Sequence, residues 1–396
     1  MIYLVNPSEK KILDNAGDRM PIGLMSIGAY MKQKGHDVQI WDLNHDMEDE
    51  LLRRVTYQDT VGISVYTSPH FSESVRLAKE LKGAKLIAGG HHATHMPETL
   101  FPYFNAVVLG EGEKGFEKAM QKDGVVYSDP SHLNEIDNLD YDMVDTGNYG
   151  ISSSGRRTGT IITSRGCPNS CSFCGKLEDK VRFEPIEKIR QQIDQLKERG
   201  FNSIYFLDDV FTVNKKRMVD ITDWMYQANM PFRVTTRANL VDESKMQYLA
   251  EDGCEWMNLG IESGSDEVLK RVNKGMDTKT NLDAVRLAGK HGIKTKGFFI
   301  IGLPGETERT AKQTIDFAKR LRQHGLSDAD FYYLTPFPGT PIWNNPHNFG
   351  IEIIDRAYTK YLQAGKRAKC VVNTEKLKSK RIEELVEEAK EEWKTD

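Results

Sequence analysis

The sequence predicts an α/β protein built from two consecutive domains with parallel β-sheets and a helical C-terminal extension. Short apolar runs alternate with amphipathic segments twice, over 1–125 and again over 158–345. The 396 residues exceed what one ordinary hydrophobic core contains. Between the two regions, 126–157 has no regular hydrophobic period, which indicates a linker. The remaining segment, 346–396, is predicted to be the extension.

The first domain is predicted to be a doubly wound, Rossmann-like sheet. Helical periods lie at 22–34 and 70–82, and strand-like runs occupy 2–5, 38–43, 61–65, 85–88 and 106–109. Short apolar strands that alternate with amphipathic helices are typical of such a sheet. Its ligands bind beyond the carboxyl ends of the strands. The residues at those ends include Asn6, Ser64, Thr67, Gly89, Gly90, His91, His92, Gly110 and Glu111.

The second domain is predicted to be a partial (β/α)6 barrel. Six strands are expected, at 160–163, 203–207, 232–235, 257–261, 295–301 and 330–334. Helical patterns fill the gaps, at 185–199, 215–228, 280–291 and 307–324. In barrels of this kind the functional residues lie at the carboxyl ends of the strands. Apolar residues at helical spacing over 376–396 predict a packing helix that closes one side of the barrel.

Composition excludes several classes of protein. The net charge of −4 and the pI of about 6.2 give no general attraction to nucleic acid or to anionic membrane. The longest apolar stretch, GFFIIGL, is too short to span a bilayer. The start, MIYLV, has no basic residue before its apolar run, so it predicts a strand rather than a signal peptide. We therefore expect a cytoplasmic protein without disulfide bonds.

Three cysteines are crowded directly after the first barrel strand, in SRGCPNSCSFCGK at 164–176. Cys167, Cys171 and Cys174 could bind zinc with a distant histidine or Cys254 as the fourth ligand. A C-x-x-C pair could instead serve thiol redox chemistry. A four-iron cluster held by three thiolates would leave one iron open to a substrate, and the spacing favours this third interpretation. Cys254 is expected to be a small buried residue and Cys370 a surface thiol.

The motif Cys167-x-x-x-Cys171-x-Phe173-Cys174 resembles the signature of the radical S-adenosylmethionine (SAM) enzymes. In that family, the open iron of a 4Fe-4S cluster binds the amino and carboxylate groups of SAM. The reduced cluster then splits the sulfonium and yields a 5′-deoxyadenosyl radical. The resemblance implies a cluster on the three cysteines, Phe173 near the adenine, and the six-unit barrel that is predicted above.

The same resemblance implies that SAM contacts the ends of the later strands, at Asp208, Asp209, Arg237, Glu262, Gly302 and Leu303. The two aspartates stand where the family often has a Gly-Gly-Glu-like segment for the methionine amine, and that motif is absent here. The arginine would face the methionine carboxylate and the glutamate the ribose or methionine part. The segment at 302–303 would back the adenine. The alternative for each is a cap, a turn or a surface ion pair.

Three segments resemble the cobalamin-binding domain of a large radical SAM subfamily, namely MPIGLMSIGAYMKQKGHDVQIWD, AGGHHATHMPE and VLGEGE. YLTPFPGTPIW at 333–343 is also similar to that subfamily. The resemblance implies that cobalamin binds at the strand ends of the first domain. The loop Asp-x-His-x-x-Gly, which supplies a histidine to cobalt in cobalamin mutases, is absent, so no protein histidine is expected on cobalt. His91, His92 and His95 are more consistent with contact to cobalamin or the barrel than with a metal site of their own.

The resemblance implies methylation of an unactivated carbon through a 5′-deoxyadenosyl radical and methylcobalamin. The alternative within the subfamily is cyclisation, rearrangement or carbon–carbon coupling without methyl transfer. A sensor without turnover is a third hypothesis, which the intact cysteine loop and the full set of barrel strands disfavour. We expect an electron donor such as flavodoxin or ferredoxin. The substrate class stays open among small molecules, lipids and other organic compounds.

Overall fold

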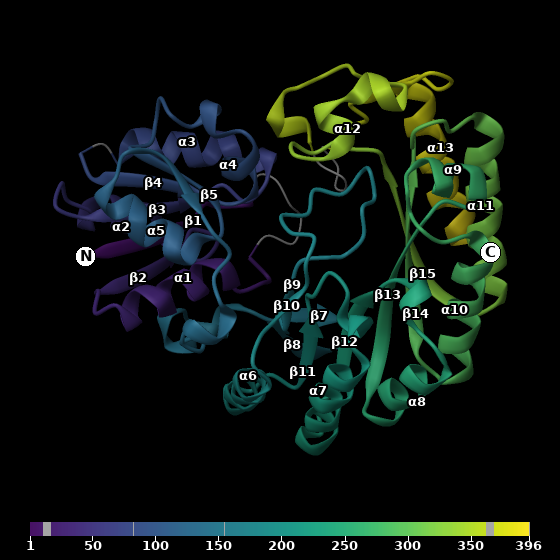
Figure 1. Cartoon of the computed structure of the whole chain (residues 1–396), viewed down its shortest axis with the longest axis horizontal. Coiled ribbons are helices and arrows are strands. Elements are labelled where there is room, and N and C mark those ends of the chain that lie inside the picture. Colours follow the sequence, from purple (N-terminus) through teal and green to yellow (C-terminus); the bar gives the residue numbers. More distant parts are fainter. Residues whose placement is uncertain (11–16, 82, 154, 362–367, 396) are drawn as a thin grey trace. The chain divides into compact units, whose positions relative to one another are not determined.

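The computed structural model describes residues 1–10, 17–81, 83–153, 155–361 and 368–395 (Figure 1). The chain divides into two compact units. The N-terminal unit comprises Met1–Gly159 with Glu198–Gly200, and the C-terminal unit comprises Thr160–Lys197 with Phe201–Asp396. No helix of the described residues is both long and apolar enough to cross a membrane.

The N-terminal unit contains a six-stranded parallel sheet of order β2-β1-β3-β4-β5-β6. Its strands are β1 (Ile2–Asn6), β2 (Val38–Asp42), β3 (Thr60–Ser64), β4 (Lys85–Gly89), β5 (Ala106–Gly110) and β6 (Gly124–Ser128). The five predicted strands are confirmed. The sixth, β6, begins before the predicted linker and extends into it. Its apolar run, Val125–Tyr127, is only three residues long, and Val126 is its one buried side chain, so the pattern of this edge strand is weak.

Helices cover this sheet, namely α1 (Ile22–Gln33), α2 (Glu48–Arg54), α3 (Phe71–Glu80), α4 (His91–His95) and α5 (Gly112–Gln121). The strands are apolar almost throughout, because both faces of a parallel sheet are buried. The strand order reverses between β1 and β3. A ligand crevice forms at such a reversal, outside the carboxyl ends of the strands.

The predicted partial barrel is present, with strands in the order β15-β14-β13-β12-β11-β8. Its strands belong to the C-terminal unit, except for residues 156–159 at the start of β8. The strands are β8 (Arg156–Ile161), β11 (Ser203–Phe206), β12 (Phe232–Thr236), β13 (Cys254–Glu262), β14 (Lys294–Ile301) and β15 (Leu326–Tyr333). All six predicted strands are present, and β11 to β15 pair in parallel. The N-terminal half of β8 also pairs antiparallel with the short β7 (Ile151–Ser153), which was not predicted.

The barrel helices are α6 (Ile186–Glu198), α7 (Lys215–Ala228), α8 (Glu243–Glu251), α9 (Asp266–Arg271), α10 (Thr278–Lys290) and α11 (Glu308–Gln323). Helices α8, α10 and α11 pack against β13, β14 and β15 (Figure 1). The strand residues on the helical side are fully buried, as at Met257, Leu259 and Ile261 on β13. Alternate residues therefore point to the opposite face of the sheet.

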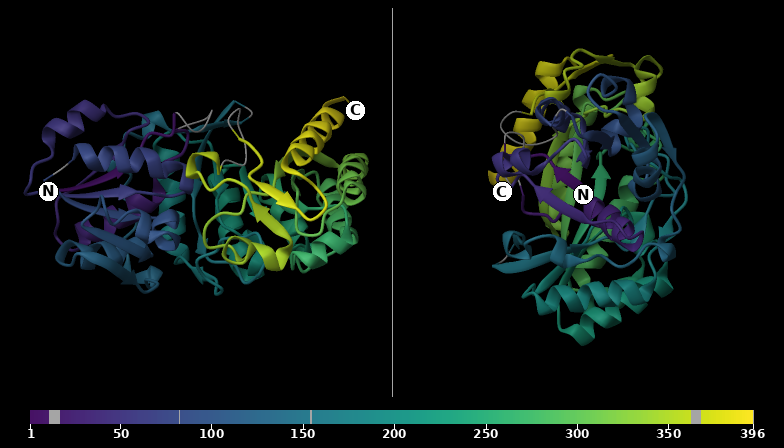
Figure 2. Two further views of the ribbon diagram at one scale, coloured as in Figure 1. Left: turned by 90° about the horizontal axis from the view of Figure 1, so that it is seen from above. Right: turned by 90° about the vertical axis from the view of Figure 1, so that its left-hand side faces the viewer.

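The extension contains α12 (Pro341–Asn344), β16 (Ile351–Ile353), β17 (Val372–Thr374) and α13 (Ser379–Thr395). The predicted C-terminal helix is confirmed as α13, which packs on β15 and α11 (Figure 2). The antiparallel pair β16–β17 was not predicted, because strands of three residues carry no detectable period. The prediction of a surface thiol at Cys370 is wrong. This residue is 6% exposed, and its Sγ lies 3.4 Å from the Val372 carbonyl oxygen.

Candidate functional site

The cysteine loop is closed at its base by a two-stranded antiparallel pair, β9 (Ser164–Arg165) and β10 (Arg182–Phe183). Gly166 enters the loop with a φ of 92°, and a Cβ there would lie 2.3 Å from the Lys180 carbonyl oxygen. Only glycine fits such a position. Lys176 adds an internal bond by donating to the Cys167 carbonyl oxygen at 3.2 Å. The strand pair, the turn at Gly166 and the Lys176 bond therefore hold the loop in shape without a ligand.

The three thiols lie close enough to influence one another. Desolvation, followed by the charges of Cys171, Asp209 and Cys167, raises the pKa of Cys174 to about 11. The amide of Cys174 also donates to the Cys171 carbonyl oxygen at 3.1 Å. Together these contacts place the predicted ligands in one cluster of side chains.

Two donors point at the sulfur atoms. Arg237 Nη1 lies 3.3 Å from Cys171 Sγ, and Asn169 Nδ2 lies 3.4 Å from Cys167 Sγ. Hydrogen bonds to sulfur and soft thiolate ligands are features of iron–sulfur sites. The described residues contain no group of three His, Cys, Asp or Glu side chains arranged to hold one metal ion. In a 4Fe-4S cluster each thiolate binds a different iron, so the chemistry of this donor set fits the cluster.

Two buried cations stand beside the cysteine loop. Arg237 is 6% exposed and donates through Nη2 to the Lys274 carbonyl oxygen. Lys274 is 4% exposed, and its Nζ lies 2.7 Å from Glu262 Oε1 and 5.9 Å from the ring centre of Phe173. Since Glu262 compensates only one of the two cations, this position suits a carboxylate ligand. Lys274 could not be predicted as a site residue, because it does not lie at the end of a strand.

Glu262 is held in an unusual backbone conformation. Its φ is 67°, which costs a non-glycine residue about 1–3 kcal/mol. The pairing of β13 with β14 shifts register between Gly260 and Glu262. A Cβ at Gly260 would lie 2.5 Å from Glu262 Oε1 and 2.9 Å from Lys274 Nζ, so the Glu262–Lys274 pair lies directly over this glycine. Strain of this kind is concentrated at functional sites.

The structure separates the two candidate aspartates. Asp208 is 2% exposed and accepts bonds from the Thr163 amide at 2.7 Å, Thr163 Oγ1 at 2.6 Å and Ser164 Oγ at 2.5 Å. It therefore anchors the entrance to the cysteine loop. Asp209 is exposed, and its charge acts on Cys174. Asp209 is thus the carboxylate that a ligand can reach.

The segment after β14 turns sharply into α11. Gly302 has a φ of 92°, and its amide donates to Glu306 Oε2 at 2.5 Å. Glu306 is fully buried, and desolvation raises its pKa to about 8 despite the bonds from the backbone at 302–303. Leu303 is also fully buried, so its side chain belongs to the core. Glu306 therefore stabilises this turn through hydrogen bonds from its backbone amides. No sequence motif marks this role.

In the N-terminal unit, two of the predicted cobalamin-binding glycines are required by the fold. Gly90 has a φ of 112°, and a Cβ there would lie 2.8 Å from the Val65 carbonyl oxygen. Gly110 has a φ of 92°, and its Cβ would lie 2.7 Å from the Ser128 carbonyl oxygen. Among the described residues, the one atom within 4.0 Å of a Cβ at Gly89 is Val108 Cβ, so those residues leave room there.

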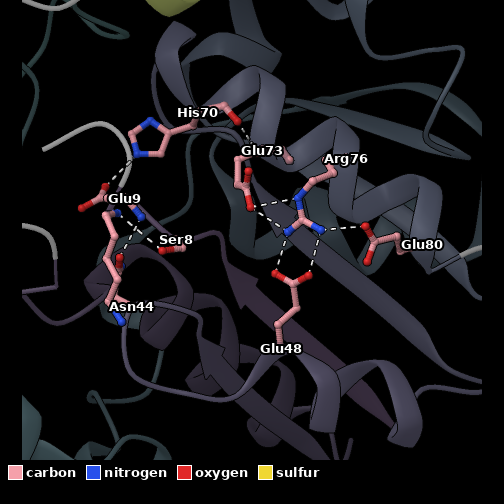
Figure 3. A network of polar contacts seen from close by, with 10 residues as sticks. Ser8, Glu9, Asn44, Glu48, His70, Glu73, Arg76 and Glu80 are labelled. Atoms are coloured by element: carbon pink, nitrogen blue, oxygen red, sulfur yellow. Dashed lines mark hydrogen bonds and ion pairs between the residues drawn. The ribbon is translucent and has the colours of Figure 1, made fainter. Parts of the chain in front are cut away.

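A hydrogen-bond chain joins the segments that follow β1, β2 and β3 (Figure 3). Thr67 Oγ1 lies 2.6 Å from His70 Nδ1, and His70 Nε2 lies 2.7 Å from Glu9 Oε1. The Glu9 amide donates to Asn44 Oδ1 at 2.7 Å. These hydrogen bonds hold Thr67, a predicted cobalamin contact, near the reversal of strand order between β1 and β3.

The other predicted contacts also lie at this edge. Asn6 Nδ2 donates to Asp42 Oδ1 at 3.1 Å, and the carbonyl oxygen of Ser64 accepts a bond from Ser74 Oγ at 3.1 Å. Glu111 Oε2 accepts from the Ser131 amide at 2.7 Å. These contacts make the strand ends a preformed polar surface.

The histidines of α4 differ in availability. His92 is 2% exposed, with Nδ1 3.1 Å from Ser68 Oγ and Nε2 3.1 Å from Thr99 Oγ1. Burial, followed by the charge of His95, lowers the pKa of His92 to about 4. Both ring nitrogens of His92 are therefore engaged within the protein. The His91 ring lies 5.0 Å from that of His95 and is less buried than His92.

Comparisons with known proteins agree with this description. The family model of the Radical SAM superfamily matches residues 161–318, and that of the B12 binding domain matches residues 12–120. A protein of Pyrococcus horikoshii described as an uncharacterized methyltransferase is 31% identical over 384 residues, which cover 87% of this chain and 82% of that protein. The anaerobic magnesium-protoporphyrin IX monomethyl ester cyclase of Cereibacter sphaeroides is 27% identical over 391 residues, covering 87% of this chain and 63% of the cyclase.

Among solved structures, the fold is similar to that of the radical SAM methyltransferase TsrM from Kitasatospora setae, which contains bound cobalamin and a 4Fe-4S cluster. The TM-score is 0.72 at 19% identity, over 91% of this chain and 84% of that one. The two domains, in this order, and the relationship to the Pyrococcus protein settle the family. The chain belongs to the radical SAM superfamily of enzymes, in the group that carries a B12 binding domain before the radical SAM domain.

Proposed function

We propose that this enzyme methylates an unactivated carbon with the help of a 4Fe-4S cluster, SAM and cobalamin. The observation that carries the proposal is the three-cysteine loop beside Arg237, Lys274 and Glu262 in a chain that also has a B12 binding domain. The methyltransferase description of the Pyrococcus relative supports the reaction type.

Different residues of the site would bind different groups of the cofactors. Cys167, Cys171 and Cys174 hold the cluster, and the Arg237 guanidinium stabilises the Cys171 thiolate. The surplus positive charge at Lys274 and Arg237 attracts the methionine carboxylate of SAM, while Asp209 attracts its amine. When bound, the cofactors supply the electron- and methyl-transfer chemistry, and the protein orients them and excludes water. The electrons would come from a small donor such as a flavodoxin or a ferredoxin.

Cyclisation or rearrangement without methyl transfer is the second candidate, because the Cereibacter relative is a cyclase. One experiment separates the two. The protein is reconstituted anaerobically with iron, sulfide and cobalamin, and is given a metabolite extract and SAM with a trideuterated methyl group. A labelled product together with S-adenosylhomocysteine supports methyl transfer. 5′-Deoxyadenosine with an unlabelled product supports the second candidate, and no consumption of SAM contradicts both.

Replacing Gly89 by valine tests the cobalamin site. We expect the fold to be retained, because among the described residues a Cβ at Gly89 meets nothing closer than Val108 Cβ at 4.0 Å, and Gly89 has no positive φ that a side chain would strain. Binding of hydroxocobalamin should weaken at least tenfold, since the side chain occupies space at the strand ends that the ligand needs. Spectroscopic titration measures the affinity, and circular dichroism checks the fold. Unchanged affinity would show that cobalamin lies elsewhere.

We expect that no histidine of this chain would bind the cobalt of cobalamin. His92 has both ring nitrogens engaged, and its lowered pKa reflects its burial. Electron paramagnetic resonance of the cobalt(II) form should therefore show no threefold splitting that comes from a histidine nitrogen. A splitting that disappears in His91→Ala would contradict this expectation, and His92→Ala serves as the matched control for a change in the local fold.

A further inference from the structure

The face of the barrel sheet that lies opposite the helices is polar. Barrel interiors are usually packed with branched apolar side chains. Here the alternate residues of β11 to β15 that do not face the helices include Tyr205, Arg233, Thr235, Asn258, Lys296, Phe298, Asp328, Asp330 and Tyr332. Because buried polar groups are costly unless they bind something, this face is suited to a polar ligand.

The register of the strands places these residues in rows. Asn258, Lys296 and Asp328 are in register across β13, β14 and β15. In the next row towards the carboxyl ends, Gly260, Phe298 and Asp330 are in register. The Glu262–Lys274 pair lies over Gly260. Since neighbouring strands are about 4.8 Å apart, Asp330 lies roughly 10 Å across the sheet from this pair, within the span of one small molecule.

Lys296, Asp328 and Asp330 form an ion triplet with a negative surplus. Lys296 Nζ lies 2.9 Å from Asp328 Oδ2 and 2.9 Å from Asp330 Oδ2. Although burial opposes the charge of Lys296, the two carboxylates raise its pKa. One lysine cannot neutralise two aspartates, so one negative charge is left without a compensating cation in the triplet.

Asp328 and Asp330 differ in how many of their carboxylate oxygens can still accept a hydrogen bond. Asp328 Oδ1 accepts from the Ala329 amide at 2.9 Å, and its Oδ2 is paired with Lys296. Asp330 Oδ2 is paired with Lys296 and also accepts from the Tyr332 hydroxyl at 2.8 Å. Among the described residues, none donates to Asp330 Oδ1. The side chain of Asp330 is 36% exposed, so this oxygen belongs to a group that a ligand can approach.

We propose that the substrate carries a basic nitrogen, as an ammonium, amidinium or guanidinium group, and that Asp330 binds it. Lys296 and Tyr332 hold the carboxylate in place, and the Phe298 ring contacts the apolar part of the substrate. An anionic substrate fits less well, because Lys296 is already shared by two carboxylates. The charge preference is argued from the triplet itself, and the reaction of the bound molecule rests on the proposed function.

Binding of two matched probes to the anaerobic holoenzyme tests the charge preference. Benzamidine is a cation, and benzamide is its neutral counterpart of nearly the same shape. We expect benzamidine to bind at least tenfold more tightly than benzamide, measured by ligand-observed NMR. Asp330→Asn should remove this preference, whereas Asp328→Asn, which deletes a charge from the same triplet, should preserve it. Equal binding of the two probes, no binding of benzamidine, or an equal loss in both variants would overturn the proposal.

A second measurement identifies the charge class of the substrate itself. A metabolite extract is sorted at pH 7 into cationic, neutral and anionic fractions, and each is incubated with holoenzyme and trideuteriomethyl SAM. The product is expected from the cationic fraction, with a KM that rises about tenfold in Asp330→Asn. A product from the anionic or neutral fraction overturns the inference but leaves the proposed function standing. If the cationic fraction alone gives an unlabelled product, the charge preference holds and methyl transfer fails.

Discussion

Replacing Cys171 by alanine is expected to abolish both the brown absorbance of the cluster and all cleavage of SAM. Cys171 is the most buried of the three loop cysteines, and Arg237 donates to its sulfur at 3.3 Å. With two thiolates left, the cluster loses a protein ligand and exposes a second iron to solvent and oxygen. Iron and sulfide content, the visible spectrum and the yield of 5′-deoxyadenosine measure the effect, which should exceed about 10³-fold in cleavage rate.

Two cysteines outside the loop provide matched controls. Cys254 and Cys370 are 5% and 6% exposed, as Cys171 is at 7%, so their replacement tests the general cost of losing a buried thiol. Both alanine variants should keep the full iron content and lose about 1 kcal/mol of stability. Full iron and full cleavage in Cys171→Ala would contradict the assignment, and so would zinc as the metal found after anaerobic preparation.

Replacing Lys274 by methionine is expected to lower the free energy of unfolding by about 3–5 kcal/mol and to abolish measurable SAM binding. The reason for the first effect is that Glu262, 7% exposed, would be left as a buried charge without its partner at 2.7 Å. The second effect follows because Lys274 contributes to the surplus positive charge beside the cysteine loop. Urea unfolding and equilibrium dialysis with SAM measure the two quantities.

A double variant separates stability from binding. In Lys274→Met with Glu262→Gln the pair leaves no buried charge behind, so much of the stability should return. SAM binding should stay lost, because Lys274 and Glu262 are both proposed to contact SAM. Lys279→Met is the control, because its pair with Asp283 is exposed to solvent and should contribute little to stability. Normal SAM affinity in the double variant would exclude Lys274 from the binding site.

The strands and the cysteine loop could be predicted because their signals are local. Strands such as β4 and β14 are apolar runs, and the spacing of three cysteines is visible in eleven consecutive residues of the printed motif, 164–174. Contacts between distant segments could not be predicted. Lys274 reaches Glu262 only because the register shift and the turn after α9 bring them together. The choice between Asp208 and Asp209 depends on which of them faces Thr163, which lies in the short segment between β8 and β9.

The burial of Cys370 and the edge strand β6 could not be predicted either. Cys370 lies next to a basic segment of the sequence, yet the pair β16–β17 and the helix α13 enclose it. Its amide donates to Glu383 Oε1 on α13 at 2.9 Å. The edge strand β6 has one buried side chain and so lacks the pattern by which the inner strands are recognised.

Several of the bonds that hold the cysteine loop in shape do not involve the cysteine sulfur atoms. Asp208 binds Thr163 and Ser164 at its entrance, β9 pairs with β10 at its base, and the Ser172 amide donates to the Val272 carbonyl oxygen at 3.0 Å. A chain that loses its cluster to oxygen is therefore expected to keep the shape of this loop. The cluster should then be rebuilt in the same polypeptide when iron, sulfide and reductant are supplied, without synthesis of a new chain.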